Sequence, residues 1–293
     1  MAEYENPQIP EGINVSTTHP LKDFALLVGG ISALILVAVL ALSLLAGQLA
    51  RHVPFEQERA LAGSLGRWLP ETPAQPVHRE RQQYLQQLAD RLGAAMDLPP
   101  EMTLTVHYSA SNTVNALATL GGHIVVFQGL IDTLPSENAL AMVMAHEIAH
   151  IRHRHPIVAM GRGFAVIFAL SSLAGIGDGA MQQWLTGVGM LPILSFSRSQ
   201  EEQADADALQ AMLRTYGHVG DAAAFFEHIA RQQTSGEPLA IFSTHPGHEE
   251  RIERIRQFAQ SHDKQEATAT TPLPGFMKEN AEKTKGTPKD SLS

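Results

Sequence analysis

Cysteine is absent from this chain of 293 residues. Its absence excludes disulfides, thiolate metal sites and cysteine nucleophiles together, so any metal must be bound by His, Asp or Glu. Basic residues are also in deficit, since 21 Lys and Arg stand against 30 Asp and Glu. The resulting net charge of −9 does not favour a nucleic-acid partner. The length allows one or two domains with a sizeable core.

Charge of either sign is missing between Asp23 and Arg51. A helix needs about 20 apolar residues to cross the hydrocarbon core of a bilayer, and residues 24–50 exceed that length. A cleaved signal peptide would have a shorter apolar core and a basic start, whereas residues 1–23 form a polar, mostly acidic tail. We therefore expect a single-pass membrane anchor at 24–50. Arg51, Arg59 and Arg67 weakly favour a cytoplasmic domain after it, but long domains translocate largely regardless of charge, so both sides stay open.

Residues 51–76 are expected to form a juxtamembrane helix and a linker. Pro54 to Leu69 has helical spacing and basic residues, and it can lie on the membrane or pack on the domain. A proline-rich break follows at Glu71 to Pro76. Val77 to Met96 then repeats apolar residues at helical spacing, which predicts a core-facing helix at the start of the domain.

Three short segments before residue 130 have strand character: Thr103 to Tyr108, Val114 to Ala118 and His123 to Phe127. The Gly121-Gly122 pair predicts a turn before the last of them. We expect a small antiparallel sheet. Its edge can pair with an extended peptide, although an ordinary hairpin packed on a helix fits the same pattern.

The sequence Ala145-His146-Glu147-Ile148-Ala149-His150 is an HExxH motif. On a helix, His146 and His150 lie one turn apart on one face, where two imidazoles can hold one Zn²⁺. Glu147 can then take a proton from a water on the metal. Chance alone gives this pattern in about 4 of every 100 chains of this length, so the setting matters. Ser136, at the predicted N-cap, starts a helix whose small apolar residues favour burial beside a cleft.

The residues after His150 do not extend the motif. Positions 153 and 156 hold His and Pro, where a metzincin needs Gly and His. His153 and His155 can be ligands, but an arginine-interleaved helix end is more typical of a solvated face. The apolar stretch Ile157 to Leu194, broken at Gly175 to Gly179, predicts a helical hairpin that dips into the membrane or walls the cleft.

Ser197 to Tyr216 predicts a helix with Glu201 and Asp205 on one face. Glu201 can supply a third ligand and leave a fourth position for water. Asp205 can accept a hydrogen bond from the far nitrogen of a ligand histidine. An exposed acidic helix is the alternative, and the alanines at 204, 206 and 208 argue against full exposure.

Taken together, His146 to His150, Phe196-Ser197-Arg198 and Glu201-x-x-Ala204-Asp205-x-x-Ala208 resemble the membrane-associated gluzincins of peptidase family M48. That family includes the type I CAAX prenyl endopeptidase, the heat-shock protease HtpX and the mitochondrial inner-membrane stress protease. Two further segments match: Asn115-Ala116 with Gly121-Gly122-His123-Ile124, and His245-Pro246 with Glu250-Arg251-Ile252. The resemblance covers about Val77 to Phe258.

The resemblance implies that His146, His150 and Glu201 bind one Zn²⁺, as the spacing had indicated. It also implies Glu147 as general base, Asp205 behind the ligands, and Asn115 and Ala116 on the strand that binds substrate. His245 lies in a loop that it places near the cleft, where the imidazole stabilises the oxyanion or gates the open metal position. A single clear transmembrane helix departs from the prenyl proteases and HtpX, and it argues against a reaction chamber inside the membrane.

Amphipathic helices are also expected at Gly220 to Gln233 and Gly247 to Gln260. From about Ser261 to the end the composition is polar, so residues 261–293 are expected to be a disordered tail.

The sequence therefore predicts a mainly helical α+β protein: a zincin-like metallopeptidase domain at 77–260 behind a transmembrane helix. We expect a zinc metalloendopeptidase in the cell (inner) membrane that acts on misfolded or unassembled membrane or envelope proteins, a role taken from the resemblance. One alternative is a zinc-containing chaperone or assembly factor with little proteolytic activity. The other, a scaffold with structural zinc, has no use for Glu147.

Overall fold

The computed structural model describes residues 20–64, 69–70, 74–175, 196–233, 245, 248–262 and 269–278. Its helices are α1 (Pro20–Ala50), α2 (Phe55–Ser64), α3 (Pro76–Ala95), α4 (Gln128–Thr133), α5 (Glu137–Arg152), α6 (His155–Ala174), α8 (Arg198–Tyr216), α9 (Ala224–Gln233) and α10 (His248–His262). The strands are β1 (Thr105–Ser109), β2 (Ala116–Ala118) and β3 (His123–Phe127). Two 3-10 turns are described, η2 (Leu120–Gly122) and η5 (Gly275–Lys278). Most of the polar tail expected at residues 1–23 and the second half of the hairpin expected at 157–194 fall outside the described residues.

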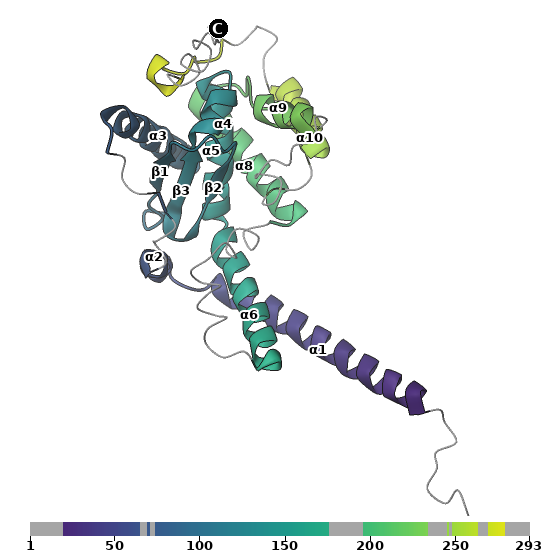
Figure 1. Cartoon of the computed structure of the whole chain (residues 1–293). Helices are drawn as coiled ribbons and strands as arrows, with labels where there is room; N and C mark the ends of the chain where they lie inside the picture. The colour runs from purple at the N-terminus through teal and green to yellow at the C-terminus, as the bar shows by residue number, and fades with distance from the viewer. Residues whose placement is uncertain are drawn as a thin grey trace, which may run out of the picture.

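The fold is mainly helical with one small sheet, as predicted, but the sheet is mixed (Figure 1). Its order is β1-β3-β2, with β2 antiparallel and β1 parallel to β3. The expectation of an antiparallel sheet is therefore wrong for β1. That expectation assumed that strands next to each other in the sequence pair with each other. Instead, residues 110–115 lead from β1 to β2 across a gap, and β3 later fills this gap between the two strands.

The turn into β3 requires the predicted glycine pair. Gly121 and Gly122 have φ angles of 69° and 82°, in the left-handed region that disfavours side chains. A Cβ on Gly122 would also lie 2.2 Å from the carbonyl oxygen of Thr103. The turn sets the β2–β3 pairing, in which Leu117 lies opposite Val125.

Helix α5 lies at the centre of the domain, between the sheet and α8 (Figure 1). All its residues from Glu137 to Ile151 are buried, and the polar residues of the HExxH motif are among them. Ser136 is its N-cap, as predicted, and the Ser136 hydroxyl accepts a hydrogen bond of 3.2 Å from the amide of Ala139. The HExxH motif therefore occupies a rigid core helix.

Glu137, the first residue of α5, joins three elements. Its carboxylate accepts hydrogen bonds from the Tyr84 hydroxyl, from the Tyr216 hydroxyl at 2.7 Å and from Arg91 at 2.7 Å. Burial would raise the pKa of Glu137, but the bonds from Tyr84, Tyr216 and Arg91 outweigh it and hold the pKa below its ordinary value. This cluster anchors the start of α5 to α3 and α8.

A C-terminal segment, residues 269–278, also packs on the domain. Thr271 accepts a hydrogen bond of 2.8 Å from the amide of Glu137 and donates one of 2.7 Å to the side-chain oxygen of Asn138. Met277 is fully buried. The expectation of disorder throughout 261–293 is wrong for these residues, because a polar average over the tail concealed the apolar cluster Leu273, Phe276 and Met277. Helix α10 likewise extends to His262.

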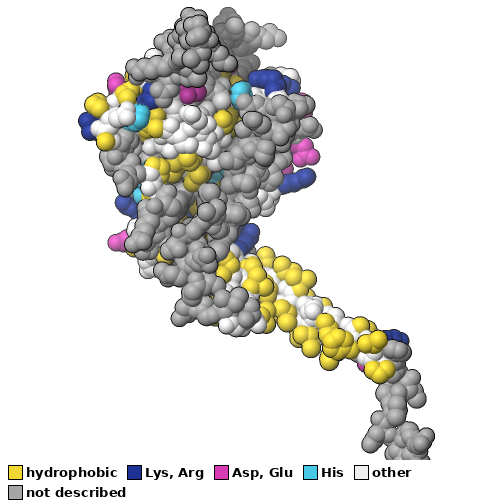
Figure 2. Space-filling view, viewed as in Figure 1, with side chains coloured by type: hydrophobic (Ala, Val, Ile, Leu, Met, Phe, Trp, Pro, Cys, Tyr) yellow, Lys and Arg dark blue, Asp and Glu magenta, His cyan; other side chains and the backbone are white. Residues whose placement is uncertain are grey.

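Helix α1 projects from the domain and exposes apolar side chains along its length (Figures 1 and 2). Both α1 and residues His155–Leu173 of α6 are long and apolar enough to cross a membrane. Of the two alternatives for the segment after the anchor, the structure shows α2 packed on the domain. Phe55 is buried, and Glu58 accepts a hydrogen bond of 2.8 Å from the amide of Gly121.

The Glu137 cluster predicts an acid-sensitive component of stability. We expect Glu137→Gln to cost about 1–3 kcal/mol at neutral pH, or roughly 3–10 °C in Tm, because the hydrogen bonds to a charged acceptor are weakened. Since the folded pKa lies below the ordinary value of 4.5, this contribution is complete above pH 4.5 and is lost as pH falls further. Calorimetry of the full chain in detergent should show the Tm gap between wild type and variant narrowing below that pH. The exposed Glu101→Gln serves as control, and a gap that stays constant with pH contradicts the assignment.

Candidate metal centre

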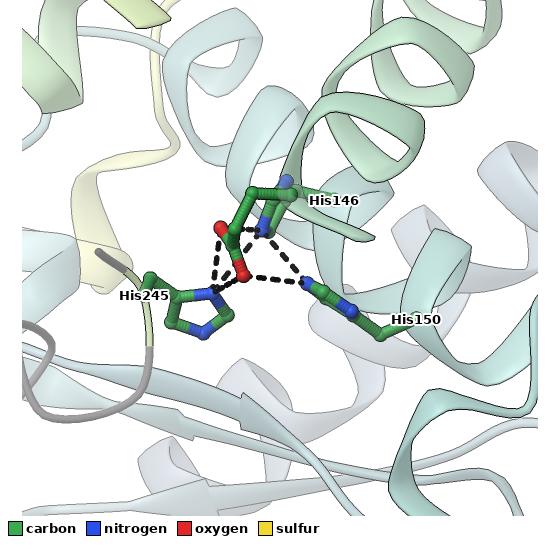
Figure 3. A group of neighbouring side chains, drawn as sticks. His146, His150 and His245 are labelled. Carbon is green, nitrogen blue, oxygen red and sulfur yellow. Dashed lines mark hydrogen bonds and ion pairs between the residues drawn. The ribbon is translucent and has the colours of Figure 1, made fainter. Parts of the chain in front are cut away.

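Four residues that are far apart in the sequence meet beside α5: His146, His150, Glu201 and His245 (Figure 3). One potential ligand atom from each lies within 4.8 Å of all the others. None of the four side chains belongs to a residue more than 3% exposed. Two come from α5, one from α8 and one from the chain just before α10. These four residues are called the metal cluster below.

The spacing of the ligand atoms fits a tetrahedral metal ion. Ligands about 2.1 Å from a tetrahedral Zn²⁺ lie about 3.4 Å from one another. Glu201 oxygens lie 3.4 Å from His146 Nε2 and 3.5 Å from His150 Nε2. The two Nε2 atoms are 3.0 Å apart, and His245 Nδ1 lies 3.3 Å from His146 Nε2. Three nitrogens and a carboxylate, without sulfur, suit a first-row divalent metal.

Helix α8 brings the carboxylates to α5. Ser197 and Gln200 form a capping box at its start, and the helix ends at Gly217 with φ 78°. Glu201 and Asp205 lie one turn apart, both buried, and Asp205 Oδ1 is 3.0 Å from His146 Nδ1. The buried alanines 204 and 208 allow close approach to α5, whereas Ala206 is exposed, so the sequence argument from all three alanines is wrong for that position.

Arg251 on α10 completes the charge arrangement, and the sequence reasoning gave it no role. The guanidinium contacts Asp205 at 2.9 and 2.7 Å and Glu201 at 2.8 Å, and it lies 4.3 Å above the Phe226 ring centre. Its side chain is buried. The sequence offered only its place in the family-like segment Glu250-Arg251-Ile252 after His245-Pro246, which does not reveal that the arginine turns inward.

Electrostatics inside the metal cluster favour a cation. Burial opposes charge on Glu201, but His245 and His146 hold its pKa far below the ordinary value. Burial likewise opposes charge on Asp205, and Arg251 together with His146 lowers that pKa. Burial and Arg251 would lower the pKa of His146, yet the hydrogen bonds to Asp205 and Glu201 raise it to about 9. The same carboxylates can stabilise a divalent cation in place of the proton, which a metal bound to the imidazole would displace.

Glu147 points from α5 toward the sheet. Its Oε2 accepts a hydrogen bond of 2.7 Å from the amide of Ala118, and its Oε1 lies 3.5 Å from His245 Nε2. Burial raises the pKa of Glu147, and His245 and His146 partly oppose that shift. A carboxylate with a raised pKa and a fixed position is suited to accept and return a proton near neutral pH.

Asn115 and Ala116 lie at the edge of the sheet next to Glu147. The carbonyl of Asn115 accepts a hydrogen bond from the Phe127 amide of β3 at 3.3 Å, so that peptide group faces into the sheet. Backbone groups alternate along a strand, and the Ala118 amide points to Glu147. The peptide groups of Ala116 and Ala118 therefore face away from β3, on the side of α5.

His153 and His155 are not members of the metal cluster. His153 contacts Asp207 at 2.8 Å near the surface. His155 is buried, contrary to the expected solvated face, and its Nδ1 lies 2.8 Å from His150 Nδ1. Phe196 stacks on the His150 ring with centres 3.9 Å apart. His155 and Phe196 thus fix the orientation of His150.

Arg251 should be essential for stability, and Arg256 on the same helix should not. Arg251→Met leaves Glu201 and Asp205 buried without their cation, so we expect a loss of about 3–5 kcal/mol. Arg256 pairs with Glu227 at 2.6 Å near the surface, so Arg256→Met should cost less than about 1 kcal/mol. Thermal unfolding of both variants in the presence of a chelator measures the difference. Equal losses would show that Arg251 does not balance the buried carboxylates.

Comparison with known proteins relates this arrangement to a family. The matched part is 29% identical to mitochondrial metalloendopeptidase OMA1 of Schizosaccharomyces pombe, over 62% of this chain and 54% of that protein. It is 32% identical to metalloprotease LoiP of Escherichia coli, over 62% of this chain and 71% of that protein. It is 29% identical to the beta-barrel assembly-enhancing protease of Escherichia coli, over 51% of this chain and 33% of that protein. The chain therefore spans only about a third to a half of the length of some relatives. The model of peptidase family M48 matches residues 79–259. The chain belongs to peptidase family M48, a family of metallopeptidases, as its motifs had indicated.

Proposed function

We propose that this protein is a membrane-anchored zinc metalloendopeptidase in which His146, His150 and Glu201 hold one Zn²⁺. The observation that carries the proposal is the tetrahedral spacing of these buried ligand atoms, with Glu147 beside them. Three protein ligands plus one exchangeable position are typical of catalytic zinc, whereas structural zinc is enclosed by four permanent protein ligands. A neighbouring carboxylate that does not bind the metal fits the catalytic type.

The chain's own residues suit peptide hydrolysis. A bound Zn²⁺ would polarise the scissile carbonyl and lower the pKa of a water. Glu147, held by the Ala118 amide, takes the proton of the attacking water and later delivers it to the leaving amine. Asp205 holds Nδ1 of His146, and His155 holds Nδ1 of His150, so both rings present Nε2 to the metal cluster.

Polypeptide substrates are proposed to bind as an added strand at β2. The outward amide and carbonyl of Ala116 and the outward carbonyl of Ala118 can pair with an extended chain, which then passes Glu147, whereas the Ala118 amide is already bonded to Glu147. Asn115 supports this edge through its bond to β3, and its buried side-chain oxygen has no hydrogen-bond partner among the described residues. A substrate amide is a suitable donor for that oxygen.

The membrane role rests on α1. Its apolar surface supports a single-pass anchor, and we propose the cell inner membrane because helices, rather than barrels, span that bilayer. We further propose misfolded or unassembled membrane and envelope proteins as substrates. The anchored domain and the names of relatives such as the beta-barrel assembly-enhancing protease support that proposal.

Glu147→Gln tests the enzymatic proposal. We expect the variant to retain one zinc per chain and to cleave about 10²- to 10⁴-fold more slowly, because only the proton transfer is removed. Proteolysis of an unfolded model protein by the detergent-solubilised full chain, with zinc content measured on the same samples, gives both readouts. Glu202→Gln, an exposed neighbour of Glu201, is the control and should match wild type. Zinc binding with equal cleavage by wild type and Glu147→Gln would refute the assigned base.

His245 favours a second candidate function, a client-binding chaperone or assembly factor with gated activity. Its Nδ1 lies 2.9 Å from a Glu201 oxygen, at the fourth corner of the metal cluster, where water or substrate would bind in an active enzyme. An enzyme gated in this way is active only in the fraction of molecules whose His245 has withdrawn.

His245→Ala separates a gate from an oxyanion-stabilising residue. For a gate that is open about a tenth of the time we expect turnover to rise about tenfold, because every molecule becomes competent. His153→Ala, outside the metal cluster, should leave turnover unchanged. A loss of activity in His245→Ala would instead assign the imidazole to the oxyanion. Full biological effect from Glu147→Gln would favour the chaperone.

A further inference from the structure

The exposed face of α6 is unusual for a water-soluble surface. Among the described residues, large exposed apolar side chains occur only on α1, at Leu61 and on α6. Those of α6 are Phe164, Phe168, Leu170 and Leu173, each 46–57% exposed. After Arg162 no charged residue occurs until Asp178. With 3.6 residues per turn, Phe164 and Phe168 lie on one side of α6 and Leu170 and Leu173 on the other, so apolar side chains surround its second half. An apolar surface of this kind marks a contact with lipid or protein.

Helices α1 and α6 pack closely through small residues where both leave the domain (Figure 1). A Cβ on Gly161 of α6 would lie 3.0 Å from the Cβ of Ala50. A Cβ on Gly47 of α1 would lie 2.8 Å from the Arg162 side chain. Small residues of this kind allow helix backbones to approach closely. The contact also places Arg162 and Gly47 at the same level.

The charges of the two helices end at that common level. Directly after α1, the first charged residue beyond the apolar stretch is Arg51, four residues from Gly47. On α6 the last is Arg162. Arginines flanking an apolar segment lie at the membrane–water interface, with the stem along apolar surface and the head toward water. The apolar exposed surface of α6 is therefore continuous with that of α1.

We infer that α6 enters the bilayer beside α1, in the leaflet nearest the domain, and presents Phe168, Leu170 and Leu173 to lipid. Eleven residues separate Arg162 from Leu173, which is about 16 Å of helix. The hydrocarbon core is about 30 Å thick, so α6 reaches about its middle. This inference rests on the proposed anchoring by α1. It makes the membrane attachment a two-helix contact in which α1 spans the bilayer, whereas α6, whose first turns up to Arg162 belong to the domain, enters it only part of the way.

A lipid-embedded α6 fixes the height of the metal cluster. Helix α6 starts at His155, whose ring contacts His150, and Arg162 lies seven residues further, about 10 Å along the axis. The metal cluster is therefore rigidly linked to the bilayer surface and only about one helix diameter away from it. Chain segments that emerge from the same leaflet are within its reach.

The absence of cysteine makes site-directed spin labelling direct, because each introduced thiol is the only one. We would label Phe164→Cys, Phe168→Cys and Leu173→Cys in the full chain reconstituted in phosphatidylcholine vesicles. Leu36→Cys is the matched lipid control, since it lies eleven residues from Gly47 as Leu173 does from Arg162, and the two are 59% and 57% exposed. Gln260→Cys, on the exposed surface of α10, is the water control. Unchanged zinc content and proteolysis verify each variant.

The measured quantity is the ratio of collision rates with oxygen, which partitions into lipid, and with a water-soluble nickel chelate. We expect the ratio to rise from Phe164 to Phe168 to Leu173 and to match Leu36 at Leu173. Nickel access at Leu173 equal to that at Gln260 would place α6 in water and overturn the inference. Protection of Leu173 from both reagents would also overturn it, since protein, from this chain or a second copy, would then cover the face. In both cases a lipid-like Leu36 leaves the α1 anchor intact, whereas nickel access at Leu36 refutes the anchor and this inference together.

Discussion

Two carboxylates buried against the HExxH helix are the constraint on which the rest of the molecule depends. Glu201 and Asp205 need positive charge close by, because an isolated buried carboxylate is costly. The histidines of α5, the arginine of α10 and a divalent metal can provide it. The packing of α5, α8 and α10 is therefore set by charge neutralisation as much as by apolar contact. Arg251, which comes from the end of the family match, closes that arrangement.

Local patterns in the sequence were enough for the elements that carry the site. HExxH on a capped helix and Glu201 with Asp205 one turn apart depend only on helix periodicity, and the structure has both helices within a residue of the expected bounds. Features that depend on long-range contacts were not predictable in this way. The parallel pairing of β1 with β3, the inward turn of Arg251 and the burial of Met277 each join segments distant in sequence. For His155, the arginines around it suggested water, whereas the fold turns the ring onto His150.

The junction of α5 and α6 connects the metal cluster to the segment that follows helix α1. Arg154 takes a left-handed conformation with φ 61°, which ends one helix and starts the next within two residues. Its side chain pairs with Glu58 of α2 at 2.7 Å and lies over the Phe55 ring. Glu58 in turn binds the Gly121 turn next to β2. The strand edge, the metal helix and the base of α1 thus share one rigid corner.

The hydrogen bonds between Thr271 and the first turn of α5 link the site to the order of synthesis. Thr271 follows Asn138 by 133 residues, so Glu137 and Asn138 receive these partners long after α1 and α5 have been synthesised. A growing chain therefore has its metal-binding motif in an incompletely held helix. In this arrangement the start of the HExxH helix is completed by a segment that is made late in synthesis, so the metal cluster is fully held in place only after α1, α8 and α10 have been synthesised.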